Sequence, residues 1–545
     1  MMNQGTAAHG RRTAPVYLDY AATTPVDPRV AAAMAVCLTP EGAFGNPGSG
    51  SHDYGDAASA LVEAARRQVA AAVGAHPEDI IWTSGATEAN NLALFGAANY
   101  YRDTGRHIVT VRTEHKAVLD PCRELERRGW QVTYLVPDRG GVLDPARVAA
   151  ALRPDTVLVS VMHVNNEIGV IQDIAAIAAV CAKHGTARLH VDAAQSVGKC
   201  ALEFDGWGLD LMSLSAHKAY GPKGAGALVV SRKRGVQLQA LQFGGGQERN
   251  LRSGTVATHQ VVGMGAAFAL AQGALNEEIP RIAQLRDRLW NDIEALGGAL
   301  RNGEAARTVA HLLNVSFEDV EGESLLAAVR PSIAVSTGSA CMSAGQEPSY
   351  VLRALGRDER LAESSLRFSL GRFSTEADVD AAVAAVSQAV MRLRRIGGYP
   401  GAGRPEPDAP PEPDARDADR GAAGCPARGH FESALSAGVL TGRGVRRGAA
   451  GSRAQGTWVQ FDMRIDASNP VETLEAVRFL AYGCPHVIAV ADWIAQTAVG
   501  REAKPILPES VQALRERFEV PVEKLGRLLI VEDAWIAAVS APYRP

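Results

Sequence analysis

Residues 156–195 decide the fold. In this stretch TVLVSVMHV (156–164) is followed by DIAAIAAVCAKHG (173–185) and ARLHVDAAQ (187–195). The first and third runs are apolar, as in buried strands, and the second has the spacing of an amphipathic helix. This order predicts parallel strands joined by a crossover helix. Because the same alternation extends from residue 16 to about residue 396, we expect an α/β fold with a large, mostly parallel sheet. Such sheets bind ligands at the carboxyl ends of their strands.

The composition narrows the class of protein. The chain has 545 residues, of which 46% are hydrophobic and 21% charged, and its formal net charge is −4. These values are typical of a soluble protein with several packed cores, and they give no basic field for nucleic acid. No run approaches the roughly 18 apolar residues of a membrane helix. The seven cysteines are scattered and odd in number, which indicates a reducing compartment. We therefore expect a cytoplasmic protein without nucleic-acid or membrane partners.

The composition changes abruptly after residue 396. Residues 397–425 are rich in Pro, Asp, Gly, Ala and Arg and almost free of large apolar side chains, which predicts an extended linker. Globular composition then returns, with strands predicted at WVQFDMRID (458–466) and AVRFLAYG (476–483) and a helix at PHVIAVADWIAQTA (485–498). The expected segments are a flexible tail (1–14), a main domain (15–396), the linker (397–425) and a small α+β domain (426–545).

Lys218 directly follows a predicted strand end, in SLSAHKAYGPKG. A lone lysine is usually a solvated charge, but a desolvated amine held beside an aldehyde forms a Schiff base. Pyridoxal phosphate (PLP) supplies such an aldehyde, and it also needs an acidic partner for its ring nitrogen and donors for its phosphate. The candidates for these tasks are Asp192 at the end of the strand HVDAAQ, the side chains of Ser215 and His217, and the helix N-terminus in TSGATEANN (83–91). This combination favours a PLP site.

Eight motifs occur in a fixed order along the main domain. They are TSGATEANN (83–91), TEHKAVLD (113–120), MHVNNEIGVIQD (162–173), HVDAAQSVGK (190–199), SLSAHKAYGPKG (213–224), RSGT (252–255), VSTGSACMSA (335–344) and SSLRFSLGRF (364–373). Together they closely resemble the cysteine desulfurases of the NifS/IscS type, which are PLP enzymes of fold type I. The resemblance covers nearly everything from residue 17 to about residue 395. It implies a large domain on a mostly parallel sheet and a small α/β domain.

The resemblance also implies a role for individual residues. Lys218 would carry the cofactor as a Schiff base, and His115 would stack on the cofactor ring. The other implied cofactor contacts are Asp192 at the ring nitrogen, Gln195 at the ring oxygen, and Ala86, Thr87, Ser215 and His217 at the phosphate, with Thr255 reaching the phosphate of the neighbouring subunit in a homodimer. Asn166 and Arg367 would bind the carboxylate of the substrate L-cysteine, a task that suits a planar guanidinium.

Cys341 is the second predicted active group. Its surroundings, VSTGSACMSAGQEPS, are dominated by Gly, Ser and Ala, which favours an exposed loop over the buried position that is usual for a free cysteine. The resemblance places the sulfur-accepting cysteine of the family here. In the implied reaction Lys218 removes the α-proton of L-cysteine, the Cys341 thiolate takes the sulfur as a persulfide, and L-alanine leaves. His115 is a candidate proton shuttle, so Cys341, Lys218 and His115 are the predicted catalytic residues.

The C-terminal domain more distantly resembles an IscU-type iron–sulfur scaffold. The resemblance rests on VRFLAYGCPHVIAVADWIAQTAVGREA (477–503) and LLIVEDAWIAAV (528–539). Scaffolds of this type use three cysteines and an aspartate as ligands. Here only Cys484 is kept, and the other positions carry Gln455, Thr457 and Arg527. Because one thiolate cannot hold a [2Fe–2S] cluster, we predict no metal site in this domain. Three roles stay open for this domain: it docks on the desulfurase, it occupies or tunes the site of the sulfur acceptor, or it accepts sulfur on Cys484. Cys341 also stays open as a shared cluster ligand.

The favoured function is thus a cysteine desulfurase that supplies sulfur to iron–sulfur cluster assembly or to other acceptor proteins, such as a scaffold. One alternative is another PLP enzyme on the same fold, such as a selenocysteine lyase or an aminotransferase. The thiol at Cys341 argues against an aminotransferase, which needs none. The other alternative is a sulfur-trafficking assembly protein in which the fused scaffold-like domain is regulatory.

Overall fold

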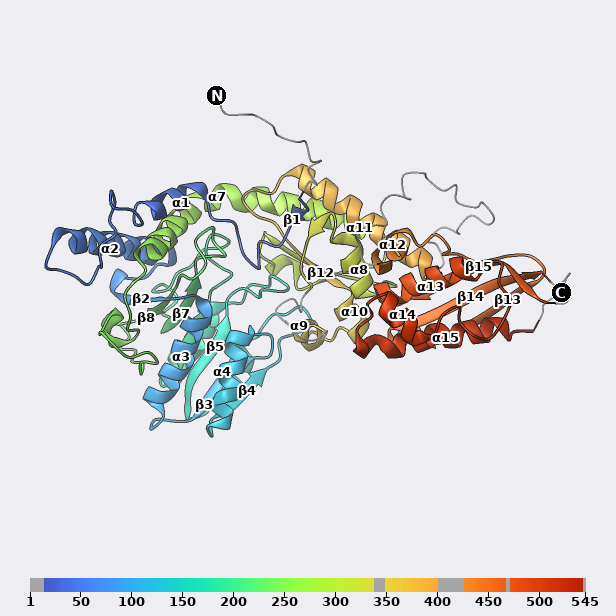
Figure 1. Cartoon of the computed structure of the whole chain (residues 1–545). Coiled ribbons are helices and arrows are strands. Elements are labelled where there is room, and N and C mark those ends of the chain that lie inside the picture. The colour runs from blue at the N-terminus through green and yellow to red at the C-terminus, as the bar shows by residue number, and fades with distance from the viewer. Residues whose placement is uncertain (1–13, 338–347, 400–425, 467–470, 543–545) are drawn as a thin grey trace, which may run out of the picture.

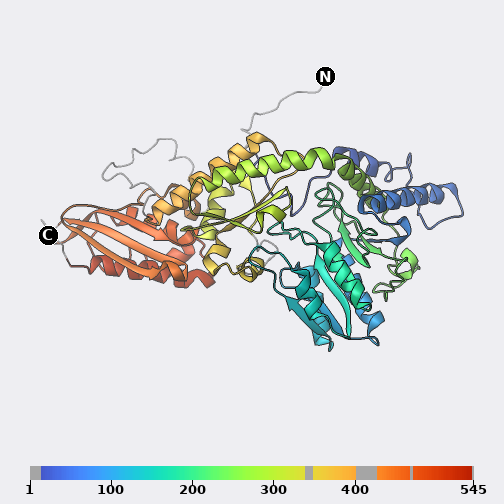
Figure 2. The same cartoon turned by 180° about the vertical axis from the view of Figure 1, so that it is seen from behind.

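The computed structural model describes residues 14–337, 348–399, 426–466 and 471–542. Nearly all of the predicted tail, most of the predicted linker and Cys341 lie outside these residues. The seven-stranded sheet and the two larger antiparallel sheets lie in a row along an elongated molecule, and the long helix α7 (Thr258–Glu294) extends from the seven-stranded sheet across the small domain (Figure 1). Seen from behind, the C-terminal domain again lies at one end and the seven-stranded sheet at the other (Figure 2).

The seven-stranded sheet is the centre of the large domain and has the order β2-β8-β7-β6-β5-β3-β4. Its strands are β2 (Ile80–Thr83), β3 (His107–Val111), β4 (Gln131–Leu135), β5 (Thr156–Met162), β6 (Arg188–Asp192), β7 (Leu211–Ser215) and β8 (Gly226–Val230). β8 is antiparallel to its neighbours β2 and β7, and the other neighbouring pairs are parallel. The prediction of a mostly parallel sheet is therefore confirmed. Thr83, Met162, Asp192 and Ser215 end their strands at the same edge.

Helices cover both faces of this sheet. Because successive side chains of a strand point to opposite faces, Ile108 and Leu158 join one apolar cluster while Val109 and Val159 join the other. The first cluster includes α3 (Ala86–Tyr101) and α4 (Lys116–Arg127), and the second includes α1 (Pro28–Ala35), α2 (Asp53–Val73), α5 (Pro145–Ala151), α6 (Ile174–His184) and the start of α7. This coverage explains the apolar character of the strands in the sequence.

The small domain is built on a three-stranded antiparallel sheet of order β12-β10-β9. Its elements are β9 (Ala299–Asn302), β10 (Leu312–Phe317), β12 (Ser365–Ser369), α8 (Gly322–Val329), α9 (Tyr350–Ala354), α10 (Glu359–Glu363) and α11 (Glu376–Ile396). The first strand of the chain, β1 (Val16–Tyr17), pairs with β11 (Ile333–Ala334), so residues from both ends of the main domain meet here. Thr375 and Asp378 form a capping box at the start of α11.

The C-terminal domain is a three-stranded antiparallel sheet with helices packed against it. Its elements are α12 (Pro426–Ser433), β13 (Val445–Ser452), β14 (Thr457–Asp466), β15 (Thr473–Tyr482), α13 (Pro485–Ala498), α14 (Val511–Arg517) and α15 (Leu525–Val539). The two strands and the helix predicted from the sequence are therefore confirmed. Among the residues described, none of the helices combines the length and the apolar character that crossing a membrane requires.

Gly448 allows β13 to approach α15 closely. A Cβ at this position would lie 2.0 Å from the backbone nitrogen of Ala538. We expect Gly448→Ala to destabilise the C-terminal domain by about 1–3 kcal/mol, because the helix must move away from the strand. Urea unfolding, monitored by hydrogen exchange of β14 and α15, measures the change in the free energy of unfolding.

The matched control is Gly526→Ala in α15, where a Cβ meets no atom within 4 Å. This substitution should leave the domain as stable as before or stabilise it by up to about 1 kcal/mol through helix propensity. Equal unfolding midpoints for the Gly448→Ala variant and the unmodified protein would contradict the packing argument.

Candidate active site

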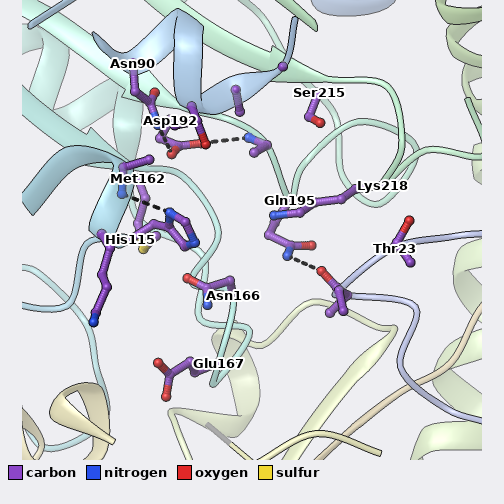
Figure 3. A pocket seen from close by; sticks show the side chains of 18 of the residues that line it. Thr23, Asn90, His115, Met162, Asn166, Glu167, Asp192, Gln195, Ser215 and Lys218 are labelled. Atoms are coloured by element: carbon purple, nitrogen blue, oxygen red, sulfur yellow. Dashed lines mark hydrogen bonds between the residues drawn. The ribbon is translucent and has the colours of Figure 1, made fainter. Parts of the chain in front are cut away.

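A cavity of about 730 Å³ lies where the carboxyl ends of the central strands face the small domain. Ten of the predicted site residues line it, and Figure 3 labels His115, Asn166, Asp192, Gln195, Ser215 and Lys218 among them. They are Ala86, Thr87, His115, Asn166, Asp192, Gln195, Ser215, His217, Lys218 and Arg367. These residues come from separate segments of the chain, so the fold brings together side chains that the sequence only suggested as a group.

Lys218 enters the cavity from the loop between the antiparallel strands β7 and β8. The loop begins at the buried end of β7, and it turns back through Tyr220, whose φ of 64° lies in the left-handed region. The side chain of Lys218 extends toward Gln195 (Figure 3). The lysine is thus an amine inside a cavity and not a charge on the surface.

Asp192 lies at the end of β6 and is 5% exposed. One carboxylate oxygen accepts a hydrogen bond from Asn90 Nδ2 at 2.7 Å, and the other accepts one from the backbone nitrogen of Ala194 at 2.9 Å (Figure 3). A buried carboxylate needs such donors to stay ionised. An ionised carboxylate at this place can bind a protonated ring nitrogen.

The N-terminus of α3 forms one wall of the cavity. The helix begins at Ala86 directly after β2, and none of the side chains that the structure describes caps it. The preceding turn packs closely, because a Cβ on Gly226 would lie 2.5 Å from the Cα of Gly85. The first backbone N–H groups of a helix are an anion site, and Ser215 and His217 line the same cavity. This group of donors suits a phosphate.

His115 is the N-cap residue of α4, and its Nδ1 accepts a hydrogen bond from the backbone nitrogen of Ala117 at 3.1 Å. An accepting Nδ1 leaves the proton of the neutral ring on Nε2. Burial, and secondly the nearby amine of Lys218, lower the pKa of His115 below its usual value. The ring is therefore neutral at physiological pH, as a ring that stacks on a cofactor or carries a proton should be.

Arg367, on β12 of the small domain, lies beside Asn166. Its guanidinium donates to the backbone oxygen of Asn166 at 2.8 Å and to Asp19 Oδ1 at 2.8 Å. The side-chain oxygen of Asn166 is buried without a hydrogen-bond partner among the described residues. A small anionic substrate needs donors, and this pair supplies them as the guanidinium of Arg367 and the amide nitrogen of Asn166.

Two predicted residues are not part of this group. Thr255, in the loop before α7, is exposed and does not line the cavity of its own protomer. Cys341 lies outside the described residues. The residues that flank its segment do line the cavity, with Ser336 and Thr337 on one side and Pro348 and Ser349 on the other.

Lys199 is a site residue that the sequence reasoning missed. Its Nζ donates to Gln195 Oε1 at 2.9 Å, while Gln195 Nε2 donates to the backbone oxygen of Ala21 at 2.7 Å. These two bonds fix the orientation of the Gln195 amide, with Oε1 toward Lys199 and Nε2 toward Ala21. Burial, with Lys218 nearby, lowers the pKa of Lys199 to about 7. The available signal was the position of Lys199 four residues after Gln195 in HVDAAQSVGK.

Two buried carboxyl groups were also not predicted. Burial raises the pKa of Glu167, which lines the cavity and accepts a hydrogen bond from Ser349 Oγ at 2.5 Å, to about 7. Burial likewise raises the pKa of Glu114 well above its usual value, although its carboxylate accepts a bond from the backbone nitrogen of Met162 at 2.6 Å. Neither residue carries a signal in the sequence that distinguishes it from a surface glutamate.

Comparison with known proteins places the chain in a family. The family model for aminotransferase class-V matches residues 16–382. The relative "Cysteine desulfurase IscS" of Pectobacterium atrosepticum is 56% identical over 382 residues, which are 70% of this chain and 94% of the relative. A solved NifS-like protein is 34% identical with a TM-score of 0.64, covering 69% of this chain and 98% of that chain. SspA, solved in complex with cysteine, is 36% identical with a TM-score of 0.59, covering 66% and 99%.

The chain therefore belongs to the aminotransferase class-V family, and its large and small domains have the arrangement of the PLP enzymes of fold type I. Within that family it is similar to the cysteine desulfurases of the IscS and NifS type, so the resemblance drawn from the eight motifs is confirmed. PLP is accordingly its cofactor, and the cavity fits that molecule. The Lys218 amine, the Asp192 carboxylate and the N-terminus of α3 line the cavity and would hold the aldehyde, the ring nitrogen and the phosphate of that molecule.

The C-terminal domain has a match of its own. The NifU-like N terminal domain model matches residues 427–543, which confirms the resemblance to an iron–sulfur scaffold domain. Cys484 is the N-cap residue of α13, is 0% exposed, and has its pKa raised by burial. The described residues contain no group of three or more His, Cys, Asp or Glu side chains placed to hold a metal ion.

Lys199→Met tests the support that Lys199 gives to Gln195. We expect the affinity of the protein for PLP to fall roughly threefold to tenfold, because the loss of one hydrogen bond of about 1 kcal/mol lets the Gln195 amide rotate. Absorbance titration of cofactor-free protein with PLP measures it. Lys183→Met, at an exposed lysine of α6, is the control and should bind PLP as the unmodified protein does. Unchanged affinity in Lys199→Met would show that Gln195 is positioned by Ala21 alone.

Proposed function

We propose that this protein is a PLP-dependent cysteine desulfurase, which converts L-cysteine into L-alanine and carries the released sulfur as a persulfide on Cys341. One observation carries the proposal: Lys218, Asp192 and the pair of Asn166 and Arg367 line a single cavity in a chain that is 56% identical to a cysteine desulfurase. The iron–sulfur character of the NifU-like domain family supports cluster assembly as the destination of the sulfur.

PLP, when bound, supplies an aldehyde for the substrate amine and an electron-withdrawing ring. Lys218 Nζ binds the cofactor and, once displaced by the substrate, accepts the proton from the substrate α-carbon. The Asp192 carboxylate holds the proton on the ring nitrogen, and the neutral ring of His115 covers one face of the site. Arg367 and Asn166 hold the substrate carboxylate, so that the α-carbon lies within reach of Lys218.

Cys341 performs the sulfur transfer in this proposal. Its thiolate attacks the substrate sulfur, so that an S–S bond forms while the substrate C–S bond breaks. The electron pair stays on the substrate carbon, which takes up a proton and becomes the methyl group of alanine. Ser336, Thr337, Pro348 and Ser349, on both sides of the segment that carries Cys341, line the cavity. This placement supports a cysteine that reaches the substrate.

The functional unit in this proposal is a homodimer in the cytoplasm. Thr255 is exposed and absent from the cavity of its own protomer, which supports its predicted role at the phosphate of a neighbouring subunit. Exposed aromatic side chains of the large domain supply apolar surface for such contacts, namely Phe44, Tyr54 and Phe243, which is 78% exposed. The proposed partners are L-cysteine and a sulfur-acceptor protein, such as an iron–sulfur scaffold.

Two substitutions separate the proposed roles. Cys341→Ser should abolish alanine release from L-cysteine while the absorbance of bound PLP persists, because a hydroxyl cannot take the sulfur. Lys218→Ala should lose the absorbance of covalently bound PLP together with the activity. Alanine assays and absorbance spectra measure both effects.

Cys37→Ala, at a buried cysteine just after α1, is the control and should keep both the activity and the spectrum. If the Cys341→Ser variant releases alanine at the rate of the unmodified protein, another group accepts the sulfur and the role of Cys341 is wrong.

A further inference from the structure

The two ends of the segment that carries Cys341 lie at two buried serines, Ser336 and Ser349. Two backbone hydrogen bonds join Ser336 to Arg367, one from the Arg367 nitrogen at 2.7 Å and one from the Ser336 nitrogen at 3.3 Å. Both serines line the cavity. The ends of this segment are therefore held at the active site, and the first of them is held by the strand that carries Arg367.

The side chain of Ser349 makes two hydrogen bonds at the other end. Its Oγ accepts from the backbone nitrogen of Leu352 at 3.1 Å, so Ser349 is the N-cap residue of α9. The same Oγ donates to Glu167 Oε2 at 2.5 Å. A hydroxyl can donate one bond while it accepts another. This one side chain thus caps the helix and ties its start to Glu167.

Glu167 lies in the loop that follows β5, and this loop is itself firmly held. Asn165 Oδ1 accepts from the backbone nitrogens of Glu167 at 2.9 Å and Ile168 at 3.1 Å. Asn314 Nδ2 donates to the backbone oxygen of Glu167 at 3.0 Å. Asn166, which is predicted to bind the substrate carboxylate, directly precedes Glu167 (Figure 3). The position of the Glu167 carboxyl group is therefore fixed relative to that of Asn166.

Apolar packing also holds α9 against this loop. Val351 and Leu352 belong to the same buried cluster as Ile168. Apolar contacts have no preferred direction, whereas a hydrogen bond sets both a distance and an angle. Burial of a carboxyl group is costly, and Glu167 is 2% exposed. A glutamate at this place is thus better explained by the directional bond that it makes than by packing.

We propose that Glu167 is a positioning residue for sulfur transfer: its hydrogen bond with Ser349 holds the start of α9, and with it one end of the segment that carries Cys341, against the loop that carries Asn166. This inference rests on the proposed desulfurase function and adds a residue to it. One loop then binds the substrate through Asn166 and positions the thiol through Glu167. Removal of the α-proton by Lys218 does not depend on this hydrogen bond.

Glu167→Ala separates the two steps of the reaction. We expect release of alanine from L-cysteine to slow roughly tenfold or more, because a small misplacement of a reacting group is enough for such a loss. Exchange of the α-hydrogen of L-alanine in D₂O needs Lys218 and PLP but no thiol, and it should stay within about threefold of the unmodified protein. Alanine assays and proton NMR measure the two rates on the same PLP-loaded protein.

Three further variants examine the hydrogen bond itself. Glu167→Gln keeps an acceptor oxygen for Ser349 and should restore alanine release to within about threefold. Ser349→Ala should slow release as Glu167→Ala does, and the double variant should be no slower than the slower single one, because both remove the same interaction. Asp358→Ala is the matched control: it removes the N-cap of the neighbouring helix α10 and should leave alanine release unchanged.

Two results overturn the positioning role. One is an unchanged rate of alanine release in Glu167→Ala, and the other is an equal loss of release and of α-hydrogen exchange, which indicates damage to the whole site. A Glu167→Gln variant as slow as Glu167→Ala also contradicts it. Failure of the proposed function looks different: the unmodified protein then exchanges the α-hydrogen of L-alanine but releases no alanine from L-cysteine, and the inference falls with that function.

Discussion

The active site depends on holding the carboxyl group of Asp192 and the amine of Lys218 together inside one cavity. Asn90 and the backbone of Ala194 donate to the two oxygens of Asp192, so both acceptors of this buried side chain have partners. Transfer of a lone carboxylate out of water would otherwise cost several kcal/mol. The sheet satisfies this constraint because β2, β5, β6 and β7 end at one edge. Asp192, the N-terminus of α3 and the loop that carries Lys218 therefore lie close together without long connecting segments.

The remaining ionisable groups of the site keep its potential positive. Burial raises the pKa of Glu167 to about 7 and that of Glu114 well above its usual value, so near neutral pH Glu114 supplies little negative charge and Glu167 only part of one. Burial also lowers the pKa of His217 to about 4, so this imidazole adds no positive charge near neutral pH. Among the other residues that line the cavity, cationic side chains outnumber anionic ones: Lys116, Arg123, Lys218, Lys223, Arg353 and Arg367 against Asp19, Glu88 and Asp192. A cavity with this balance attracts anions such as a phosphate and an amino-acid carboxylate. The preference of the cavity for anions thus depends on the burial of Glu114 and Glu167 as well as on the charges of Lys218 and Arg367.

Much of the fold and most of the site could be predicted from the sequence. Strand–helix alternation and the motifs located Lys218 and Asp192, because strand ends and turns are local features of the chain. Lys199 and Glu167 could not be found in this way, since their roles depend on hydrogen bonds to Gln195 and Ser349 that only the folded chain creates. The two carboxylates at the start of α8 likewise have no local signal, because their partners lie some 200 residues away on α15 and in the segment just before it.

Apolar contacts and ion pairs contribute in different ways to the interface between the small and C-terminal domains. The continuous apolar cluster supplies the favourable free energy of association, which scales with the apolar area removed from water. Ion pairs that are partly buried add little net stability, because each charge loses its hydration. They do fix the orientation of the domain, since another orientation would leave the buried Lys524 and the partly buried Glu323 without partners. The apolar contacts and the ion pairs together therefore favour one fixed position of the C-terminal domain on α8.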